Sequence, residues 1–162
     1  MEKQVIGRFD KADFPLLHLE DISVKIDTGA YTSSIHCDNI IEKDGSLHCT
    51  FLDEEHPLYN GKEFIFKEYT TVLVRSSNGA MQKRFQVKST IRLFGKIFKI
   101  SLSLSARQEM RYPVLIGRKF LTKKFIVDPE LKDVSYNLKN NEYKNPVGSF
   151  IFVIFRGVFF RI

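Results

Sequence analysis

The sequence lacks the features that mark several common classes of protein. Its 162 residues include no tryptophan and only two cysteines, Cys37 and Cys49, which are too few for a disulfide-stapled scaffold. The first five residues, Met-Glu-Lys-Gln-Val, do not begin the apolar stretch of a secretory signal. These absences predict a cytoplasmic protein with reduced thiols, although a bridge between the two cysteines is not excluded.

Metal and nucleic-acid signatures are also missing. No His-Glu-x-x-His or Cys-x-x-Cys motif occurs, so the sequence predicts no metal and no other cofactor. The 25 Lys and Arg residues are scattered along the chain and form no dense block, which argues against a nucleic-acid partner. The net charge of +6 leaves two interpretations open, an anionic partner or a merely basic soluble surface.

No long helical pattern is present, and alternation of apolar and polar residues dominates instead. Residues 84–93 alternate, and they are predicted to pair with residues 69–75 across the Asn78-Gly79 turn. Residues 5–9 are predicted as an opening strand and residues 10–19 as a connection. Residues 106–111 have room for one helical turn, and residues 117–123 for one short amphipathic helix. The prediction is an all-β fold, closed or nearly closed into a barrel.

The carboxyl-terminal part of the chain breaks this pattern. Residues 139–146 are polar and are predicted to form a linker, and residues 147–162 are largely apolar. That tail is shorter than the about 20 apolar residues of a typical transmembrane helix. An added strand, a dimer contact and a peripheral membrane element all remain open. We therefore divide the chain into a domain at residues 1–138 and a linker with its tail at residues 139–162.

The chemistry centres on the end of one predicted strand. Ile22, Val24 and Ile26 alternate with polar residues, so the strand is half-buried and ends in Asp27. Thr28 and Gly29 follow directly, and a glycine there permits a tight turn. Much later comes the run Pro113-Val114-Leu115-Ile116-Gly117-Arg118, in which apolar residues again lead into a glycine.

This pair of motifs resembles the retropepsin-type aspartic peptidases. The resemblance rests on Ile26-Asp27-Thr28-Gly29-Ala30 and on Val114-Leu115-Ile116-Gly117-Arg118. A closer resemblance, over about residues 5–137, is to the bacterial RimK-associated (RimB-like) family, long labelled ATP-dependent zinc proteases. The segments that carry this closer resemblance are residues 25–33, 89–93, 110–118 and 125–129. The resemblance implies a closed acid-protease barrel that acts as a two-fold homodimer.

Peptide hydrolysis by carboxylates explains why a dimer is implied. One carboxylate takes a proton from water while the other gives one to the substrate, and two close carboxylates share a proton, as they do in aspartic proteases generally. The sequence has one Asp-Thr-Gly and no second copy. Asp27 must therefore meet Asp27 of a second subunit. By resemblance, Thr28 and Gly29 brace the paired loops, and Leu115, Ile116 and Gly117 pack behind them.

Several residues beside these motifs are candidates for substrate binding. By resemblance, a β-hairpin flap closes over the substrate, and residues 76–83 or 59–62 could supply it. Arginines beside the matched segments could bind carboxylates or could instead anchor the barrel. The family's association with an ATP-grasp glutamate ligase suggests an acidic, glutamate-rich peptide or protein substrate. The substrate-binding candidates are Ala30, Asn78, Gly79, Arg84, Arg111 and Arg118.

Two rival functions remain. A zinc peptidase would draw its ligands from the pairs His36-Cys37 and His48-Cys49, with His18 and His56 in reserve. Neighbours on a strand face opposite ways, so each pair could offer one ligand only. The other rival is a barrel that binds peptides without cutting them, because a fold does not prove an activity.

Overall fold

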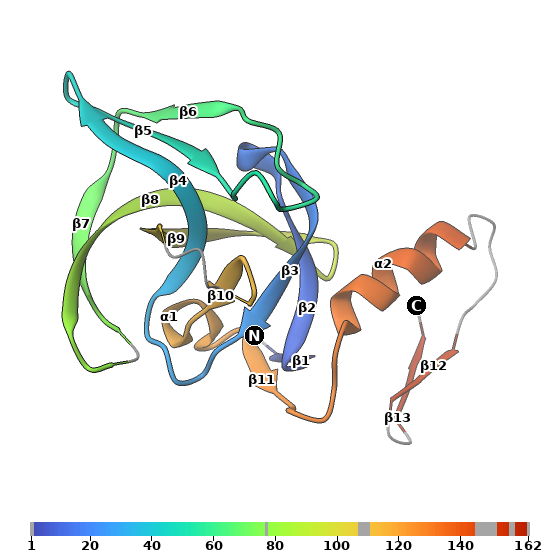
Figure 1. Ribbon diagram of the computed structural model, residues 1–162. Coiled ribbons are helices and arrows are strands. Elements are labelled where there is room, and N and C mark those ends of the chain that lie inside the picture. The colour runs from blue at the N-terminus through green and yellow to red at the C-terminus, as the bar shows by residue number, and fades with distance from the viewer. Residues whose placement is uncertain (1, 77, 107–110, 145–151, 156–157, 162) are drawn as a thin grey trace.

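The computed structural model describes residues 2–76, 78–106, 111–144, 152–155 and 158–161. Six strands close into a barrel (Figure 1). They are β2 (Phe9–Phe14), β3 (Leu19–Ile26), β4 (Ser33–Lys43), β8 (Met81–Leu93), β9 (Lys96–Ser105) and β10 (Val114–Ile116). The short β10 closes the barrel because it pairs in parallel with β3 and antiparallel with β4. The all-β prediction is confirmed.

Alternation along the strands fills this barrel. Val87, Ile91 and Leu93 of β8 are each at most 1% exposed, whereas Lys88 and Arg92 between them face solvent. The same period of two buries Ile22, Val24 and Ile26 of β3. One face of each strand therefore builds the core, which fixes the register in which the strands pair.

Further strands extend the barrel on both sides. β5 (Ser46–Phe51) and β6 (Glu63–Phe66) continue the sheet from β4, and β7 (Thr70–Arg75) pairs with β8 across the predicted Asn78-Gly79 turn. β1 (Gln4–Ile6) and β11 (Phe125–Val127) form a separate parallel pair. The helical segments are η1 (Pro15–Leu17), α1 (Arg118–Leu121) and α2 (Val134–Lys144), and α1 lies within the short helix predicted at residues 117–123.

Two segments differ from the sequence prediction, and they depend on one another. Residues 10–14, predicted as a connection, belong to β2, and residues 139–144, predicted as linker, belong to α2. Asp10 is 1% exposed in β2, and its carboxylate accepts hydrogen bonds from the backbone N–H groups of Ser135 and Tyr136 in the first turn of α2. Asp13 is likewise buried and accepts from Lys139 Nζ at 3.1 Å. These buried carboxylates give β2 the composition of a polar loop.

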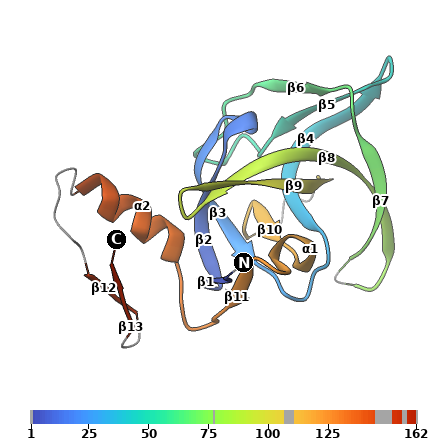
Figure 2. The same cartoon turned by 180° about the vertical axis from the view of Figure 1, so that it is seen from behind.

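The end of the chain lies apart from the barrel. β12 (Phe152–Phe155) and β13 (Val158–Arg161) form an antiparallel hairpin beyond α2, on the opposite side of the barrel from β7 (Figure 2). An added strand was one of the options for this tail, but its role stays open, and so does the division of the chain at residue 138. The helical turn predicted at residues 106–111 falls largely outside the described residues. None of the helices in the described ranges has the length and apolar character needed to cross a membrane.

Candidate active site

Asp27 lies where the alternation predicted it, in the first position after β3. Its backbone N–H donates to the Ile116 carbonyl of β10 at 2.9 Å, so the end of one strand is fixed to the end of its parallel neighbour. The Asp27 side chain is partly buried, and its Oδ1 accepts a hydrogen bond from the Gly29 N–H at 3.0 Å. A tight turn thus holds one carboxylate oxygen and leaves Oδ2 for other partners.

Gly117 supports this turn from behind. Its N–H donates to the buried Ser33 Oγ at 3.0 Å. A Cβ at this position would lie 2.6 Å from the Thr32 carbonyl oxygen, which is a backbone atom that cannot swing away. The Ser33 carbonyl in turn accepts from Ser103 Oγ at 3.2 Å. The position therefore requires glycine for close approach, and two buried serines lock the surrounding chain.

Arg118 holds the front of the same turn. One guanidinium nitrogen, Nη1, donates to the Thr28 carbonyl at 2.8 Å, and the Arg118 backbone N–H donates to the Ala30 carbonyl, also at 2.8 Å. The guanidinium carbon lies 6.0 Å from the centre of the Tyr31 ring. Arg118 was a candidate for substrate binding, and the structure places it as an anchor of the loop that carries Asp27.

The remaining motif residues lie on the loop after Asp27 and on β10. Thr28 and Gly29 are exposed at the rim of the barrel, and Ala30 is partly buried. Leu115 is partly buried, between Lys25 of β3 and Ser34 of β4, and Ile116 is fully buried. The exposed Thr28 and Gly29 leave the loop accessible to a second molecule.

The other substrate-binding candidates lie on the β7–β8 hairpin and in the segment before β10. Asn78 and Gly79 form the exposed tip of the β7–β8 hairpin, where Asn78 Oδ1 accepts from the Ala80 N–H at 3.1 Å and Gly79 has a φ of 83°. Arg84 lies on the same hairpin and donates to Gln82 Oε1 at 3.0 Å. Arg111 precedes β10 and lines a separate small cavity. The structure therefore brings Arg118 to Asp27, but not Arg111.

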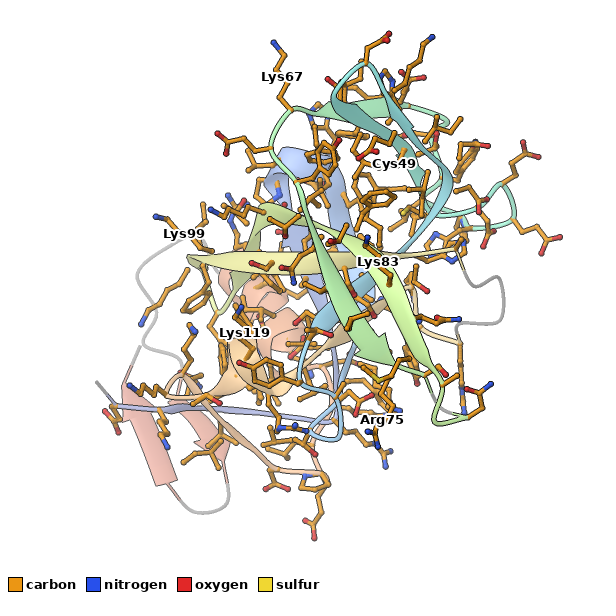
Figure 3. All side chains as sticks on the ribbon, turned by 90° about the vertical axis from the view of Figure 1, so that its left-hand side faces the viewer. Cys49, Lys67, Arg75, Lys83, Lys99 and Lys119 are labelled. Carbon is orange, nitrogen blue, oxygen red and sulfur yellow. The ribbon has the colours of Figure 1, made fainter. Side chains whose placement is uncertain are left out.

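A hollow of about 500 Å³ begins beside the Asp27 turn at Thr32 and Ser33. Its walls come from β8, β9 and the segment around α1. Among the described residues that line it there are four lysines and no acid: Lys88, Lys99, Lys119 and Lys124. Figure 3 shows Lys99 and Lys119 on one side of the molecule. Sequence reasoning missed this hollow because its lysines are up to 36 positions apart, counted from Lys88 to Lys124.

The proposed metal ligands do not form one centre. Cys37 and Cys49 are buried free thiols, and the hydrogen bond between them, together with burial, raises the pKa of Cys37. His48 Nδ1 lies 2.8 Å from Glu63 Oε1, whereas His18 lies near Lys62. In the part of the chain that the structure describes, no three His, Cys, Asp or Glu side chains are grouped so as to hold a metal ion.

Comparison with known proteins gives a family match that spans both site motifs. Residues 5–137 match the RimB-like family, described as retropepsin-like aspartic endopeptidase RimB. A solved structure of a Legionella pneumophila protein of unknown function is 30% identical, with a TM-score of 0.63, and the match covers 83% of this chain and 99% of that one.

Curated relatives carry a different name. A probable alpha-L-glutamate ligase from Shewanella halifaxensis is 35% identical over 133 residues, and one from Desulfotalea psychrophila is 32% identical over 136 residues. The matches cover 78% and 80% of this chain but only 29% of each relative, so the chain spans less than a third of their length. Because the family match extends over most of the chain and includes both site motifs, the chain belongs to the RimB-like family of retropepsin-like aspartic endopeptidases.

Proposed function

We propose that the protein is an aspartic peptidase that hydrolyses peptide bonds as a homodimer. The observation that carries the proposal is the Asp27 turn, in which a partly buried carboxylate is fixed at the closure of the barrel by β10, Gly117 and Arg118. A fixed carboxylate is what the reaction requires, since its geometry must be held while a proton moves. The family membership supports the same activity.

The mechanism needs two such turns. The exposed Thr28 and Gly29 of two subunits meet across a two-fold axis, which brings the two Asp27 carboxylates together. Close carboxylates share one proton because both cannot ionise cheaply. The ionised Asp27 takes a proton from a water molecule between them, and the protonated Asp27 donates to the carbonyl oxygen of the substrate. Water is the nucleophile, so no acyl-enzyme forms. The tetrahedral adduct collapses when the C–N bond breaks and the leaving nitrogen takes a proton from the carboxyl pair.

The β7–β8 hairpin is the better of the two flap candidates. Its turn lies at the same end of the barrel as the loop between β3 and β4 that contains Asp27 (Figure 1). The turn at residues 59–62 instead contacts the far side, where Lys62 Nζ lies 3.1 Å from His18 Nδ1. A flap over Asp27 would exclude bulk water during the reaction. We therefore assign the flap to residues 76–83.

The hollow beside Thr32 supports an acidic substrate. Its four lysines would attract carboxylates of a peptide that extends from the Asp27 turn, and field lines concentrate in such a depression. The names of the relatives support a functional link to a glutamate ligase, because a segment similar to this chain is part of each of those proteins. The proposed substrate is thus a glutamate-rich peptide.

Paired peptides test this preference. We expect a glutamate-rich peptide to be cleaved with a KM at least tenfold lower than a neutral peptide that has the same scissile bond. Replacing Lys99 and Lys119 with Gln should raise the KM for the acidic peptide alone and leave kcat largely unchanged. Lys43, exposed on β4, is the matched control as Lys43→Gln. Equal KM values for the two peptides would count against the acidic preference but not against the peptidase.

The peptidase itself is tested at Asp27. Asp27→Asn should reduce kcat by about 10⁴-fold or more, because the amide can neither hold nor accept the shared proton. Peptide binding, followed by fluorescence anisotropy, should remain. A statine inhibitor should block the wild type, whereas a chelator should leave it active. Activity that is lost to the chelator and retained with the statine would support the zinc alternative.

The second candidate function is a peptide-binding barrel without catalysis. The exposed Asp27 turn and the lysine-lined hollow would serve binding equally well. Under this alternative the wild type binds acidic peptides but turns over no member of a peptide library, and Asp27→Asn changes nothing.

A further inference from the structure

A second, smaller cavity lies away from the Asp27 turn. Its volume is about 190 Å³, and it opens between β3, β4, the connection from β5 to β6, and the segment before β10. The residues that matter here are His36, Asp53, His56 and Arg111. The lining also includes Ser23, four positions before Asp27 on β3, which corresponds to about 13 Å along a strand. The cavity is therefore distinct from the proposed peptidase centre.

His36 lines this cavity, and its ring lacks hydrogen bonds within the described part of the chain. The residue is 3% exposed, and neither ring nitrogen has a hydrogen-bond partner among the described residues. A buried donor or acceptor left unpaired costs about 1–3 kcal/mol, so such a group calls for an explanation. A histidine here is consistent with a partner that binds from the cavity.

The surroundings of His36 define one end of that partner. Its Nε2 lies 3.5 Å from Asp53 Oδ2 and 3.8 Å from Asp38 Oδ1. These separations are ion-pair distances when His36 is protonated, but they are too long for good hydrogen bonds, so a cationic group from a ligand could take the place of the imidazolium at these carboxylates. With the ring proton on Nδ1, all three atoms are acceptors. An ammonium group has three N–H donors and matches them, whereas a metal-holding group is absent from the described residues.

The other wall of the cavity offers donors instead. Arg111 contributes a guanidinium, which binds carboxylates in a bidentate manner. His56 Nδ1 accepts a hydrogen bond from the Leu58 N–H at 3.1 Å, which leaves the proton of the neutral ring on Nε2. Burial lowers the pKa of His56. The charge of Asp53 acts in the opposite direction, and His36 lowers the pKa further, so the neutral ring dominates at pH 7. The cavity thus presents acceptors for a cation and donors for an anion.

We propose that this cavity binds a free α-amino acid, with its ammonium at His36 and Asp53 and its carboxylate on Arg111 and His56. The volume corresponds to about six water molecules at 30 Å³ each, which fits a small zwitterion and is too small for a drug-sized ligand. The site is independent of the proposed peptidase function, because none of these residues touches the Asp27 turn. Binding, not turnover, is therefore the appropriate readout.

Calorimetric titration of the full chain with a panel of free amino acids tests the proposal. At least one member, with glutamate, aspartate and glycine included, should bind with a Kd below about 10 mM. Its N-acetyl derivative and its analogue without the amino group should bind at least tenfold more weakly. Arg111→Gln and Asp53→Asn should each weaken binding at least tenfold. Arg92→Gln, an exposed arginine outside this cavity, is the control and should bind as the wild type does.

The two variants separate the two ends of the ligand. Asp53 Oδ1 accepts a hydrogen bond from the Glu55 N–H, and the amide oxygen in Asp53→Asn can still accept it. Arg111 is exposed, so both variants should fold. Asp53→Asn should not weaken binding of the amine-free analogue. Failure of the whole panel to bind, equal affinity for the N-acetyl derivative, or unchanged affinity in both variants would overturn the proposal. Binding of Zn²⁺ alone at the same residues, detected by NMR as a change in the His36 ring resonances, would also overturn the proposal.

Discussion

At the scale of single residues, the local geometry explains why position 117 is a glycine. Any side chain there would press against the Thr32 carbonyl, and its N–H is satisfied by the buried Ser33. The Asp27 and Gly117 motifs were visible in the sequence because the two together, in this order, resemble the motif pair of retropepsin-type peptidases. The supporting roles of Ser33 and Ser103 were not, since a serine after a turn looks the same whether it faces solvent or a buried amide.

Ser33→Ala tests this support. The change leaves the buried Gly117 N–H without an acceptor and should lower the free energy of unfolding by about 1–3 kcal/mol. Urea denaturation followed by circular dichroism measures the loss. Ser46→Ala, on a partly exposed position of β5, is the matched control and should change stability by less than about 0.5 kcal/mol. Equal effects in the two variants would show that the Ser33 hydroxyl does not hold the turn.

Asp10 explains at the scale of elements why one strand and one helix were missed together. An aspartate in the sequence suggests a surface residue, and α2 lacks a strong apolar face, so neither element was predicted. The Asp10 carboxylate and the first N–H groups of α2 are hydrogen-bond partners, although they lie 125 positions apart in the sequence. Strands β7 and β8 were predicted correctly because their alternation and their Asn-Gly turn are local signals. Contacts that distant in sequence leave no local pattern.

Asp10→Ala should release α2 from the barrel. The variant leaves the Ser135 and Tyr136 N–H groups without their shared acceptor, as in the loss of a helix cap, and should cost about 1–2 kcal/mol. Hydrogen exchange should accelerate at those two amides and along α2 while the amides of β8 and β9 stay protected. Uniform acceleration through the barrel would instead mean that Asp10 stabilises the whole fold.

The charge of Asp10 gives this contact a pH dependence. Burial raises the pKa of Asp10 above its ordinary value of 3.8, against the hydrogen bonds from Ser135, Lys11 and Tyr136 that lower it. The folded state therefore binds the proton more tightly than the unfolded state does, and this difference favours folding at acid pH and fades as pH rises through the raised pKa. Relative to Asp10→Asn, which does not titrate, the wild type should lose stability as the pH rises from the ordinary pKa of 3.8 through the raised pKa, as measured by urea denaturation.

One end of the whole molecule collects the features that a dimer would use. The loop after β3, the β7–β8 turn and the β1–β11 pair lie at the same end of the barrel in Figure 1, whereas α2 lies to one side. Val5 and Ile126, on the β1–β11 pair, are large apolar residues that are 38% and 53% exposed. A second copy at this end would cover them and would bring the two Asp27 turns together, which no sequence pattern could locate.

Mixed dimers decide whether two copies share one centre. If each site needs both Asp27 carboxylates, co-refolding equal amounts of wild type and Asp27→Asn gives about one quarter wild-type dimers by random pairing, and activity per total protein should fall to about one quarter. Independent monomer sites would give about one half. Co-refolding with the exposed Lys43→Gln variant should preserve full activity and so controls for losses in refolding. Because one quarter and one half differ twofold, a quantitative peptidase assay distinguishes a centre shared by two subunits from a site that is complete in one chain.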